Sequence, residues 1–476
     1  MTPKMFILHI LAGFLIFNGF QCSPCNVRKY GDNNIVCVCN ETYCDELNLL
    51  SDVASNQAAL YETNQNGARF QSSILNFSKG IDRDITVVAI NRSEMYQFIL
   101  GFGGAFTDAT GININSVTPK LQKKIISSYF SKTGLEYTMG RVPIAKDFTL
   151  KIPIIKAAMA ESVKSLLLFG TPWSPPAWMK TNNAMNGKGF LREYQTNNIT
   201  FWGMTVQNEP TDGCVVDFPF QSLCFPPDMQ RDFLKMDLGP ALKKAGFTPD
   251  KLKVMINDDN RVTLPKWAQV ILSDTEAAQY VSGIAFHWYL EDYFPHKLLD
   301  ITHALYPNLF YLPSETCTGS YPWDFPKVAL GHWDRGERYA HDIIQDLLNW
   351  SIGYIDWNLV LDMQGGPNWV SNFVDAPIIV NLGTNEFYKQ PMYYALAQFS
   401  KCLPRGSYRI GLNASSALSA DIGSNFNMAA FQTPEDKIVV IAVNRLNVPL
   451  HFALNDPQKG YLKVTVNARS IQSYVW

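Results

Sequence analysis

Glu209 and Glu315 are the two side chains whose type and spacing could carry chemistry. Each ends a short apolar run, residues 201–208 before Glu209 and residues 309–314 before Glu315. Such runs predict buried parallel strands, and Pro210 stops the first, so both carboxylates should lie at the carboxyl ends of strands. Two carboxyl groups in one pocket acquire different pKa values, which lets one donate a proton while the other stays ionised.

The separation between the two glutamates corresponds to three strand–helix units of roughly 30–35 residues each. This spacing fits strands 4 and 7 of an eight-stranded α/β barrel, in which chemistry lies at the carboxyl ends of the strands. A single glutamate at a strand end is more often merely solvated. Two of them at matching strand ends, each among aromatic residues, favour a functional pair.

Apolar runs alternate with segments of helical spacing in the middle of the chain. Strands are expected at 137–143, 165–169, 253–256 and 281–289, and helices at 121–130, 152–163, 229–244 and 264–272. Such alternation is typical of a parallel α/β architecture. By contrast, residues 58–100 and the C-terminal runs 437–443 and 461–475 have the pattern of β-strands that pair beside the barrel.

Six short motifs follow one another along the chain. They are Gly101-Phe102-Gly103-Gly104-Ala105, Trp173-Ser174-Pro175-Pro176, Asn208-Glu209-Pro210, His287-Trp288-Tyr289, Ser314-Glu315 and Gly365-Gly366-Pro367-Asn368-Trp369-Val370. In this order they resemble the lysosomal glucosylceramidase (acid β-glucosidase) family, from about residue 25 to the end. The resemblance implies a (β/α)₈ TIM-type barrel with an all-β immunoglobulin-like sandwich and a small disulfide-bonded β-sheet domain. It also implies hydrolysis of glucosylceramide to glucose and ceramide by a retaining double displacement, without a cofactor.

The same resemblance assigns roles to individual side chains. Glu209 is expected to be the acid/base and Glu315 the nucleophile, and retention requires their carboxyl groups to lie about 5–5.5 Å apart. The expected substrate-binding residues are Asn208, Tyr289, His287, Trp357, Asn372 and Arg141.

Several of these residues also have structural interpretations. Without the family, Asn208 is equally well explained as a strand-end cap, and a lone His287 is more often a structural hydrogen bonder. Arg141 beside a carboxylate pair is about as often structural as functional. Trp173, Trp178 and Trp369 either stack on sugar or pack in the core.

Two segments that the family carries have no counterpart in this sequence. No helix of useful length is predicted between the strand at 165–169 and the strand at 201, although parallel neighbours need a crossover, normally a helix. In the family this helix includes a tryptophan that lines the sugar pocket. A longer insertion after Pro143 is also missing; it begins with an aspartate that binds glucose hydroxyls, and Asp147 is the one candidate for that role here.

These gaps keep two alternatives open. One is an inactive or impaired relative that binds lipid or a receptor, and the other is a retaining β-glycosidase of other sugar specificity. The resemblance implies a glycolipid substrate in membranes, a saposin-type activator, a lysosomal sorting receptor, and a place in the lysosomal lumen, peripheral to the membrane. The aromatic loops 293–295 and 321–325 are expected to contact lipid, or else to pack as ordinary loops.

Composition excludes several other classes. The 476 residues are 47% apolar and 13% aromatic, which allows two to four domains with a large core. Forty basic against forty-two acidic residues give a net charge of −2, so the balance indicates no nucleic-acid partner. No metal site is expected, because the seven histidines show no metal-ligand spacing. Residues 101–104 lack the complete G-x-G-x-x-G of a nucleotide loop and predict a tight barrel turn.

Residues 1–20 have the pattern of a signal peptide, and no later apolar run is long enough for a transmembrane segment. Passage through the secretory pathway agrees with sequons at Asn40, Asn76, Asn91 and Asn413, which we expect to be glycosylated. Two more sequons lie at Asn198 and Asn349. Asn349 lies in a helix-like apolar stretch and should be glycosylated inefficiently.

Cysteines gather near the N-terminus, where five of the nine occupy positions 22, 25, 37, 39 and 44. In a secreted chain this cluster predicts disulfides rather than a zinc site. The family resemblance implies the pairs Cys25 with Cys37 and Cys39 with Cys44. Cys22 is then left over, and its place within the removed peptide is an open alternative.

The expected domains are discontinuous in sequence. After the signal peptide, the predicted ranges are 21–48 with 359–390 for the small disulfide-containing β domain, 51–96 with 407–476 for the β-sandwich, and 97–358 with 391–406 for the catalytic barrel.

Overall fold

The computed structural model describes residues 24–47, 53–144, 148–173, 190–291, 293–414 and 423–476. Its centre is an eight-stranded parallel sheet, as predicted. The strands are β6 (Gly101–Ala105), β7 (Met139–Pro143), β8 (Leu167–Thr171), β9 (Phe201–Thr205), β10 (Lys253–Asn260), β11 (Val281–His287), β12 (Phe310–Glu315) and β13 (Gly353–Asn358). Each strand pairs with the next from β6 to β12, β13 pairs with β6, and a bridge from Tyr311 to Ser351 brings the last two strands together. The sheet is therefore a nearly closed barrel, with β9 and β12 as its fourth and seventh strands.

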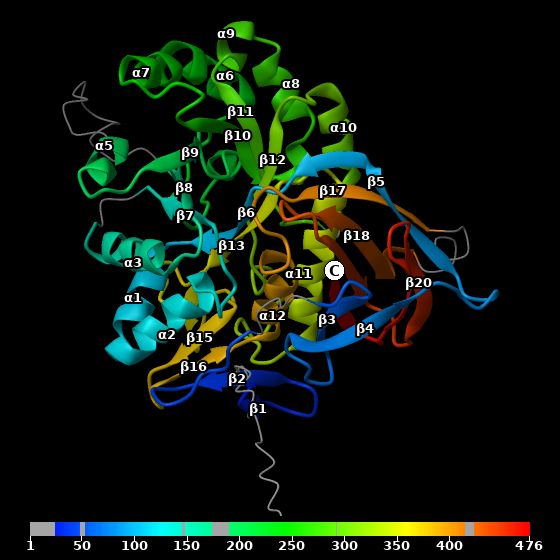
Figure 1. Cartoon of the computed structure of the whole chain (residues 1–476). Coiled ribbons are helices and arrows are strands. Elements are labelled where there is room, and N and C mark those ends of the chain that lie inside the picture. The colour runs from blue at the N-terminus through cyan, green and yellow to red at the C-terminus, as the bar shows by residue number, and fades with distance from the viewer. Residues whose placement is uncertain (1–23, 48–52, 145–147, 174–189, 292, 415–422) are drawn as a thin grey trace, which may run out of the picture.

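Helices cover the outside of the barrel (Figure 1). They are α1 (Asp108–Asn115), α2 (Pro119–Phe130), α3 (Phe148–Glu161), α5 (Phe190–Gln195), α6 (Pro227–Phe233), α7 (Gly239–Lys244), α8 (Lys266–Leu272), α9 (Thr275–Ala278), α10 (Lys297–Leu305), α11 (Trp333–Leu348) and α12 (Pro391–Ser400). The long helix α11 buries Tyr339, Ile343 and Leu347, which recur every four residues and so form one apolar face. No helix in the described ranges combines the length and the apolar composition that a bilayer crossing requires.

The prediction of no helix between β8 and β9 was wrong in part. The six-residue helix α5 lies in this crossover, and its buried Tyr194 packs edge-on against Phe201 of β9, with ring centroids 5.1 Å apart. β8 and β9 pair in parallel, with Phe169 opposite Gly203. A helix of less than two turns is too short to show a 3.6-residue period, which is why the sequence did not reveal it. Asp147 and Trp178 lie outside the described residues.

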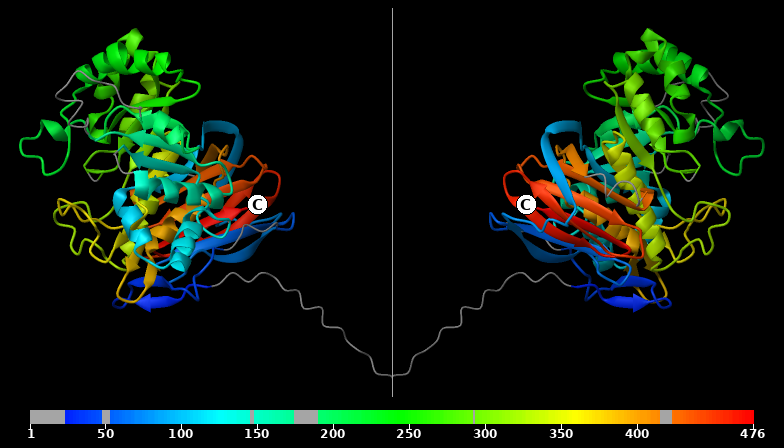
Figure 2. Two further views of the ribbon diagram at one scale, coloured as in Figure 1. Left: turned by 90° about the vertical axis from the view of Figure 1, so that its left-hand side faces the viewer. Right: turned by 90° about the vertical axis from the view of Figure 1, so that its right-hand side faces the viewer.

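The β-sandwich lies beside the barrel (Figure 2). Its described strands are β3 (Gln57–Asn64), β4 (Gln71–Ser78), β5 (Val87–Phe98), β17 (Tyr408–Ala414), β18 (Phe426–Gln432), β19 (Ile438–Asn444), β20 (Leu450–Asp456), β21 (Gly460–Val466) and β22 (Ser470–Val475). The expected pairing of the two chain ends is confirmed, because β22 runs antiparallel to β3. β19 is an unbroken apolar run because both its faces are buried: Val440 faces the sandwich core and Val439 faces the barrel side.

The small third sheet joins the N-terminus to a late part of the chain. It contains β1 (Val27–Lys29), β2 (Ile35–Cys39), β14 (Val360–Asp362), β15 (Ile378–Asn381) and β16 (Glu386–Lys389). The disulfides Cys25–Cys37 and Cys39–Cys44 are confirmed. A third disulfide, Cys214–Cys224, was not predicted, and Cys22 lies outside the described residues.

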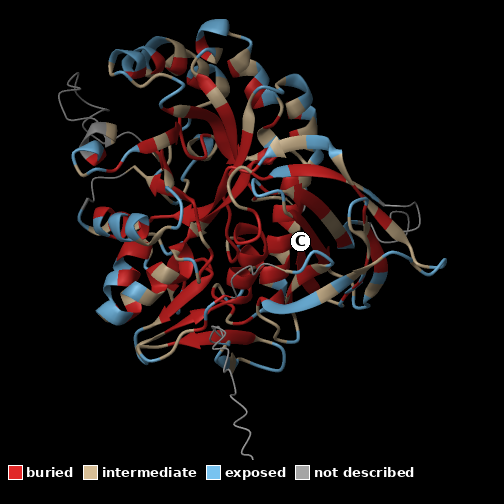
Figure 3. Ribbon diagram, in the orientation of Figure 1, coloured by how far each residue is buried: buried red, intermediate tan, exposed pale blue. Residues whose placement is uncertain are grey.

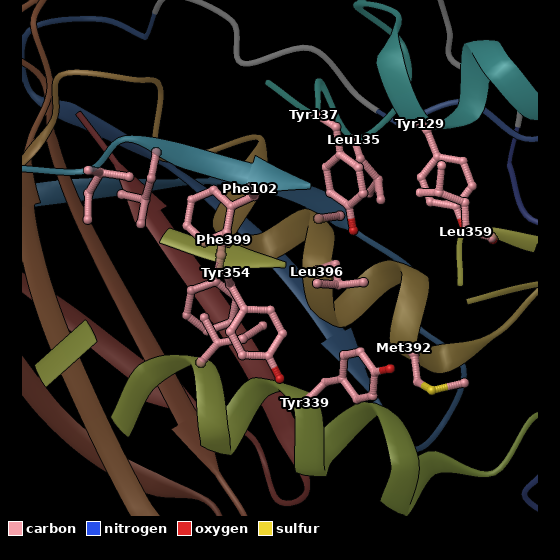
Figure 4. Close-up of a cluster of buried hydrophobic side chains, with 14 of the residues drawn as sticks. Phe102, Tyr129, Leu135, Tyr137, Tyr339, Tyr354, Leu359, Met392, Leu396 and Phe399 are labelled. Atoms are coloured by element: carbon pink, nitrogen blue, oxygen red, sulfur yellow. The ribbon is translucent and has the colours of Figure 1, made fainter. Parts of the chain in front are cut away.

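Helix α12 ties the three parts together. All of its residues are buried, and it contacts β6 of the barrel, β3 and β22 of the sandwich, and β16 of the small sheet. Figure 4 shows Leu396 and Phe399 of α12 among Phe102 of β6 and Tyr339 of α11. The buried strands and the exposed outer helix faces are also visible in Figure 3. Because α12 is buried on every side and contacts all three parts, it fixes them relative to one another.

A buried charge network fixes α11 to the barrel. Arg261, which follows β10, lies 3.1 Å from Asp342 and 3.5 Å from Asp346 on α11, and His296 lies 2.9 Å from Asp342. Although burial opposes it, the hydrogen bond from His296 and the charge of Arg261 lower the pKa of Asp342. Tyr354 also donates to Asp342 at 3.1 Å. The network depends on Arg261, whose guanidinium is, among the described residues, the one that reaches both aspartates.

Replacing Arg261 with Met should therefore lower the free energy of unfolding by about 3–5 kcal/mol, because it leaves buried carboxylate charge without its partner. Denaturant unfolding at neutral pH measures this loss. Arg231→Met is the matched control, since Arg231 is partly exposed and pairs with its neighbour Asp232; its effect should stay within about 0.5 kcal/mol. Equal effects of the two substitutions would contradict the role of this network.

Candidate active site

Glu209 and Glu315 meet at the carboxyl-terminal mouth of the barrel. One carboxylate oxygen from each, together with one ring nitrogen of His287, lie within 4.8 Å of one another. Both glutamates are buried. Glu209 follows β9 in a turn with a φ of 39°, and its backbone N–H donates to the carbonyl of Asp258 at 2.8 Å. The structure thus brings together the pair that the sequence singled out.

Arg141, the middle residue of β7, connects the two glutamate strands. It donates to Glu315 through Nη1, and through Nη2 to Asn208 Oδ1 at 2.7 Å and Asp258 Oδ2 at 3.1 Å. Burial opposes its charge, but Asp258 and Glu315 raise the pKa of Arg141 above its ordinary value. Arg141 therefore holds Glu315 and orients the amide of Asn208.

His287 lies between two carboxylates. Its Nδ1 is 3.0 Å from Glu209 Oε1 and its Nε2 is 3.1 Å from Asp258 Oδ1, which also accepts from Ser314 Oγ at 2.6 Å. Burial alone would lower the pKa of His287, but the surrounding Glu315, Asp258 and Glu209 raise it to about 10. The ring is therefore an imidazolium at acidic and neutral pH, with each nitrogen donating to one carboxylate.

Asp258 is a residue of this network that the sequence analysis missed. It is fully buried on β10 and contacts both Arg141 and His287, which outweigh its burial and lower its pKa. A signal was available, because Asp258-Asp259 end an apolar barrel strand in the same way as Glu209 and Glu315 do. The same criterion applied to every predicted strand would have included it.

Tyr289 and two tryptophans complete the wall around the glutamates. Tyr289 donates to Glu315 Oε1 at 2.9 Å and lies 3.2 Å from Cys317 Sγ. Trp173 and Trp357 stack with ring centroids 5.2 Å apart, and the Arg141 guanidinium lies 5.0 Å and 5.4 Å from the two centroids. Such a wall presents flat apolar surface beside the carboxylates, which suits the face of a sugar ring.

Among the described residues, Asn372 and Trp369 have no recorded hydrogen bond or ring contact with this cluster. Asn372 is exposed on the loop after β14, its backbone N–H bonds Asn368 Oδ1 at 3.0 Å, and in the described part of the chain no hydrogen bond joins it to either glutamate. Trp369 is also exposed.

The charged groups of the site need one proton to be neutral overall. Arg141 and His287 are cations, and Glu209, Asp258 and Glu315 are carboxyl groups, so one additional proton makes the cluster neutral. Burial raises the pKa of Glu315, an effect that Arg141 and His287 only partly offset. At Glu209, burial acts in the same direction, but the hydrogen bond and charge of His287 outweigh it and lower the pKa. The shared proton therefore favours Glu315 over Glu209.

Comparisons with known proteins agree with this geometry. The chain matches the family model described as glycosyl hydrolase family 30 TIM-barrel domain over residues 99–149, 145–192 and 189–403, and the glycosyl hydrolase family 30 beta sandwich domain over 406–474. The three barrel matches meet near residues 145–149 and 189–192, close to the two places where the sequence analysis expects missing segments.

Individual relatives match the chain over most of its length. It is 38% identical to lysosomal acid glucosylceramidase of Mus musculus, over 98% of this chain and 99% of that protein. It is 43% identical to the Caenorhabditis elegans protein named "Putative glucosylceramidase 4", over 84% and 86%. Among solved structures, SrfJ of Salmonella typhimurium matches with a TM-score of 0.77 at 24% identity, over 88% of this chain and 99% of that one. This last likeness shows the fold alone.

Proposed function

Because this chain belongs to glycosyl hydrolase family 30, we propose that it hydrolyses the β-glucosidic bond of glucosylceramide to glucose and ceramide, with retention at the anomeric carbon. The observation that supports this most is the short distance between the oxygens of Glu209 and Glu315, within 4.8 Å. Retaining glycosidases hold their carboxyl groups about 5–5.5 Å apart, whereas inverting ones need roughly 6.5–9.5 Å to admit a water. The relatives named as glucosylceramidases favour the glycolipid as the substrate.

In the proposed reaction Glu315 attacks the anomeric carbon while Glu209 protonates the leaving ceramide oxygen. Arg141 and Tyr289, which bind opposite oxygens of Glu315, hold its carboxylate in place for this attack. Water then hydrolyses the glucosyl ester, with Glu209 accepting its proton. Asn208 binds the sugar 2-hydroxyl, and Trp357 packs against the ring.

The lysosomal relative supports a proposed compartment, whereas the proposed partners rest on the family resemblance alone. We place the enzyme in the lysosomal lumen, reached through the secretory pathway, with a saposin-type activator and a lysosomal sorting receptor as partners. Glycans at Asn40, Asn76, Asn91 and Asn413 agree with this route; Asn76 and Asn413 are exposed. Asn349 is a poorer acceptor, because its side chain donates to the Gln345 carbonyl at 2.7 Å.

The purified chain, given glucosylceramide in anionic vesicles and a panel of aryl glycosides at acidic pH, tests the proposal. We expect release of ceramide and a preference for the β-glucoside. A preference for another sugar would indicate that the substrate is a different glycoside and not glucosylceramide. No turnover of any substrate by folded protein would support the inactive, lipid- or receptor-binding alternative.

Aromatic side chains beside the site offer a way to reach membrane lipid. Trp323 and Phe325, in the loop after β12, are 66% and 90% exposed, and Tyr293 after β11 is 64% exposed. Replacing Trp323 and Phe325 with Ser should lower hydrolysis of vesicle-bound glucosylceramide by about tenfold or more, because each buried aromatic ring contributes roughly 1.5–3 kcal/mol to lipid contact. Hydrolysis of a soluble aryl glucoside should change less than about twofold. Val448→Ser, at an exposed position on the sandwich, is the control. Unchanged vesicle activity would refute the docking role.

A further inference from the structure

The loop that follows Glu209 is closed on itself. The disulfide Cys214–Cys224 bridges it, and Phe225 N–H donates to the Pro210 carbonyl at 3.0 Å. Gly213 lies close to the other side of the loop. A β-carbon at this position would lie 2.1 Å from the backbone nitrogen of Cys224. The disulfide and this hydrogen bond therefore hold the segment 210–225 in one shape, and Gly213 permits the close approach of its two sides.

This closed loop holds Asp212 against Glu209. Asp212 begins a short 3₁₀ turn, Asp212–Cys214, and its backbone N–H donates to the Glu209 carbonyl at 3.0 Å. The adjoining Thr211 is fixed from the barrel side, since its N–H and hydroxyl both donate to Asp259 Oδ2, at 3.0 Å and 2.7 Å. The half-buried Asp212 side chain then forms a hydrogen bond with the Glu209 carboxyl group.

Two carboxyl groups can share a hydrogen bond only when one of them carries a proton. Burial, and then the charge of Glu209 and the hydrogen bond to it, raise the pKa of Asp212 to about 9. Asp259 of β10 and His287 of β11 also face Asp212. The charge of Asp259 raises the pKa of Asp212, and the charge of His287 lowers it. The pair of Asp212 and Glu209 thus retains one proton through the neutral range.

We propose that Asp212 is a positioning residue that supplies Glu209 with its proton. The Asp212 O–H proton moves along the hydrogen bond to the Glu209 carboxylate, which leaves Asp212 ionised and Glu209 protonated. Glu209 then gives the proton to the leaving oxygen. When water attacks the glucosyl ester, Glu209 takes the proton of that water and returns it to Asp212, so that the pair ends as it began.

This inference rests on the proposed function, and it addresses how Glu209 obtains a proton when the proton shared by the glutamates favours Glu315. Glu315 must lose its proton before it attacks as a carboxylate, and Asp212 supplies Glu209 with a different one. Because the pair keeps this proton up to about pH 9, the fraction of protonated Glu209 stays constant over a wide range. Without Asp212, that fraction falls tenfold for each pH unit above the pKa of Glu209 itself, which is lowered.

The test is the pH dependence of kcat/KM for Asp212→Asn. Below about pH 9 Asp212 is neutral, so the amide changes neither the charge nor the size of the side chain, but it carries no proton to transfer. We expect the alkaline limb of the profile to move to lower pH by at least about one unit. Asp212→Glu, which restores a carboxyl group, should move the limb back toward the wild-type position. Asp217→Asn, an exposed position in the same loop, is the control and should reproduce the wild-type profile.

The limb position does not depend on how much protein is folded, so reduced yield of a variant does not obscure the result. An Asp212→Asn profile that superimposes on the wild-type profile, while hydrolysis persists, overturns this inference alone. Absence of hydrolysis by the wild-type chain overturns the proposed function, and this inference with it.

Discussion

Replacing Glu315 with Gln is expected to lower hydrolysis of every glucoside by about 10⁴-fold or more, the order of loss seen when a catalytic nucleophile is removed. The amide has the shape of the carboxyl group but cannot form the ester with the sugar. Steady-state rates on glucosylceramide and on an aryl glucoside measure the loss. Glu276→Gln, at an exposed position on α9, is the control and should leave both rates within about twofold.

Azide distinguishes a missing nucleophile from a damaged site. In Glu315→Ala, azide can enter the space of the lost carboxylate and attack an activated β-glucoside from the face that Glu315 occupied. The expected product is the α-glucosyl azide, formed at a rate that rises with azide concentration. A β-glucosyl azide would mean that Glu315 is the acid/base and that the two roles are exchanged.

Replacing Glu209 with Gln should lower hydrolysis of glucosylceramide by about 10²–10⁴-fold, the usual contribution of general acid catalysis. The ceramide oxygen is a poor leaving group and needs a proton, whereas an acidic phenol leaves without one. The rate of the first step, in which the glucosyl-enzyme forms, should therefore fall much less for an activated aryl glucoside. The glucosyl-enzyme should then accumulate. Rapid-mixing measurements of phenol release record this difference as a burst.

The comparison between leaving groups also decides which glutamate is the acid. The shared proton favours Glu315, because burial raises the pKa of Glu315 and His287 lowers the pKa of Glu209. The roles proposed here are wrong if the substitution at Glu209 lowers hydrolysis of both substrates equally, and the substitution at Glu315 lowers hydrolysis of glucosylceramide more than that of the aryl glucoside. Discrimination at Glu209 alone supports Glu209 as the acid.

The sequence predicts most of the barrel and the carboxylate pair because both depend on local patterns. A buried parallel strand is a continuous apolar run, and the carboxyl ends of such strands meet at one mouth, so Glu209 and Glu315 could be brought together before their contacts were known. Helix α11 could be recognised in the same way from its periodic apolar face. Helix α5 could not, because it is shorter than two turns.

Contacts between charged side chains far apart in the sequence had no such signal. Asp258 meets Arg141 only because β7 and β10 approach the same mouth, and Arg261 meets Asp342 only when α11 packs on the barrel. The disulfide Cys214–Cys224 and the place of Asp212 follow from the closure of one loop, which composition does not specify. Asn372, which the resemblance implies as a sugar ligand, instead lies exposed, with no hydrogen bond to either glutamate in the described chain.

The most direct test of the central claim is to trap the glycosyl-enzyme and locate it. A 2-deoxy-2-fluoro-β-glucoside with a good leaving group, followed by proteolysis and mass spectrometry, should place one sugar adduct on the peptide that contains Glu315, and Glu315→Gln should abolish it. An adduct on a different residue, or release of α-glucose without any trapped intermediate, would contradict the account.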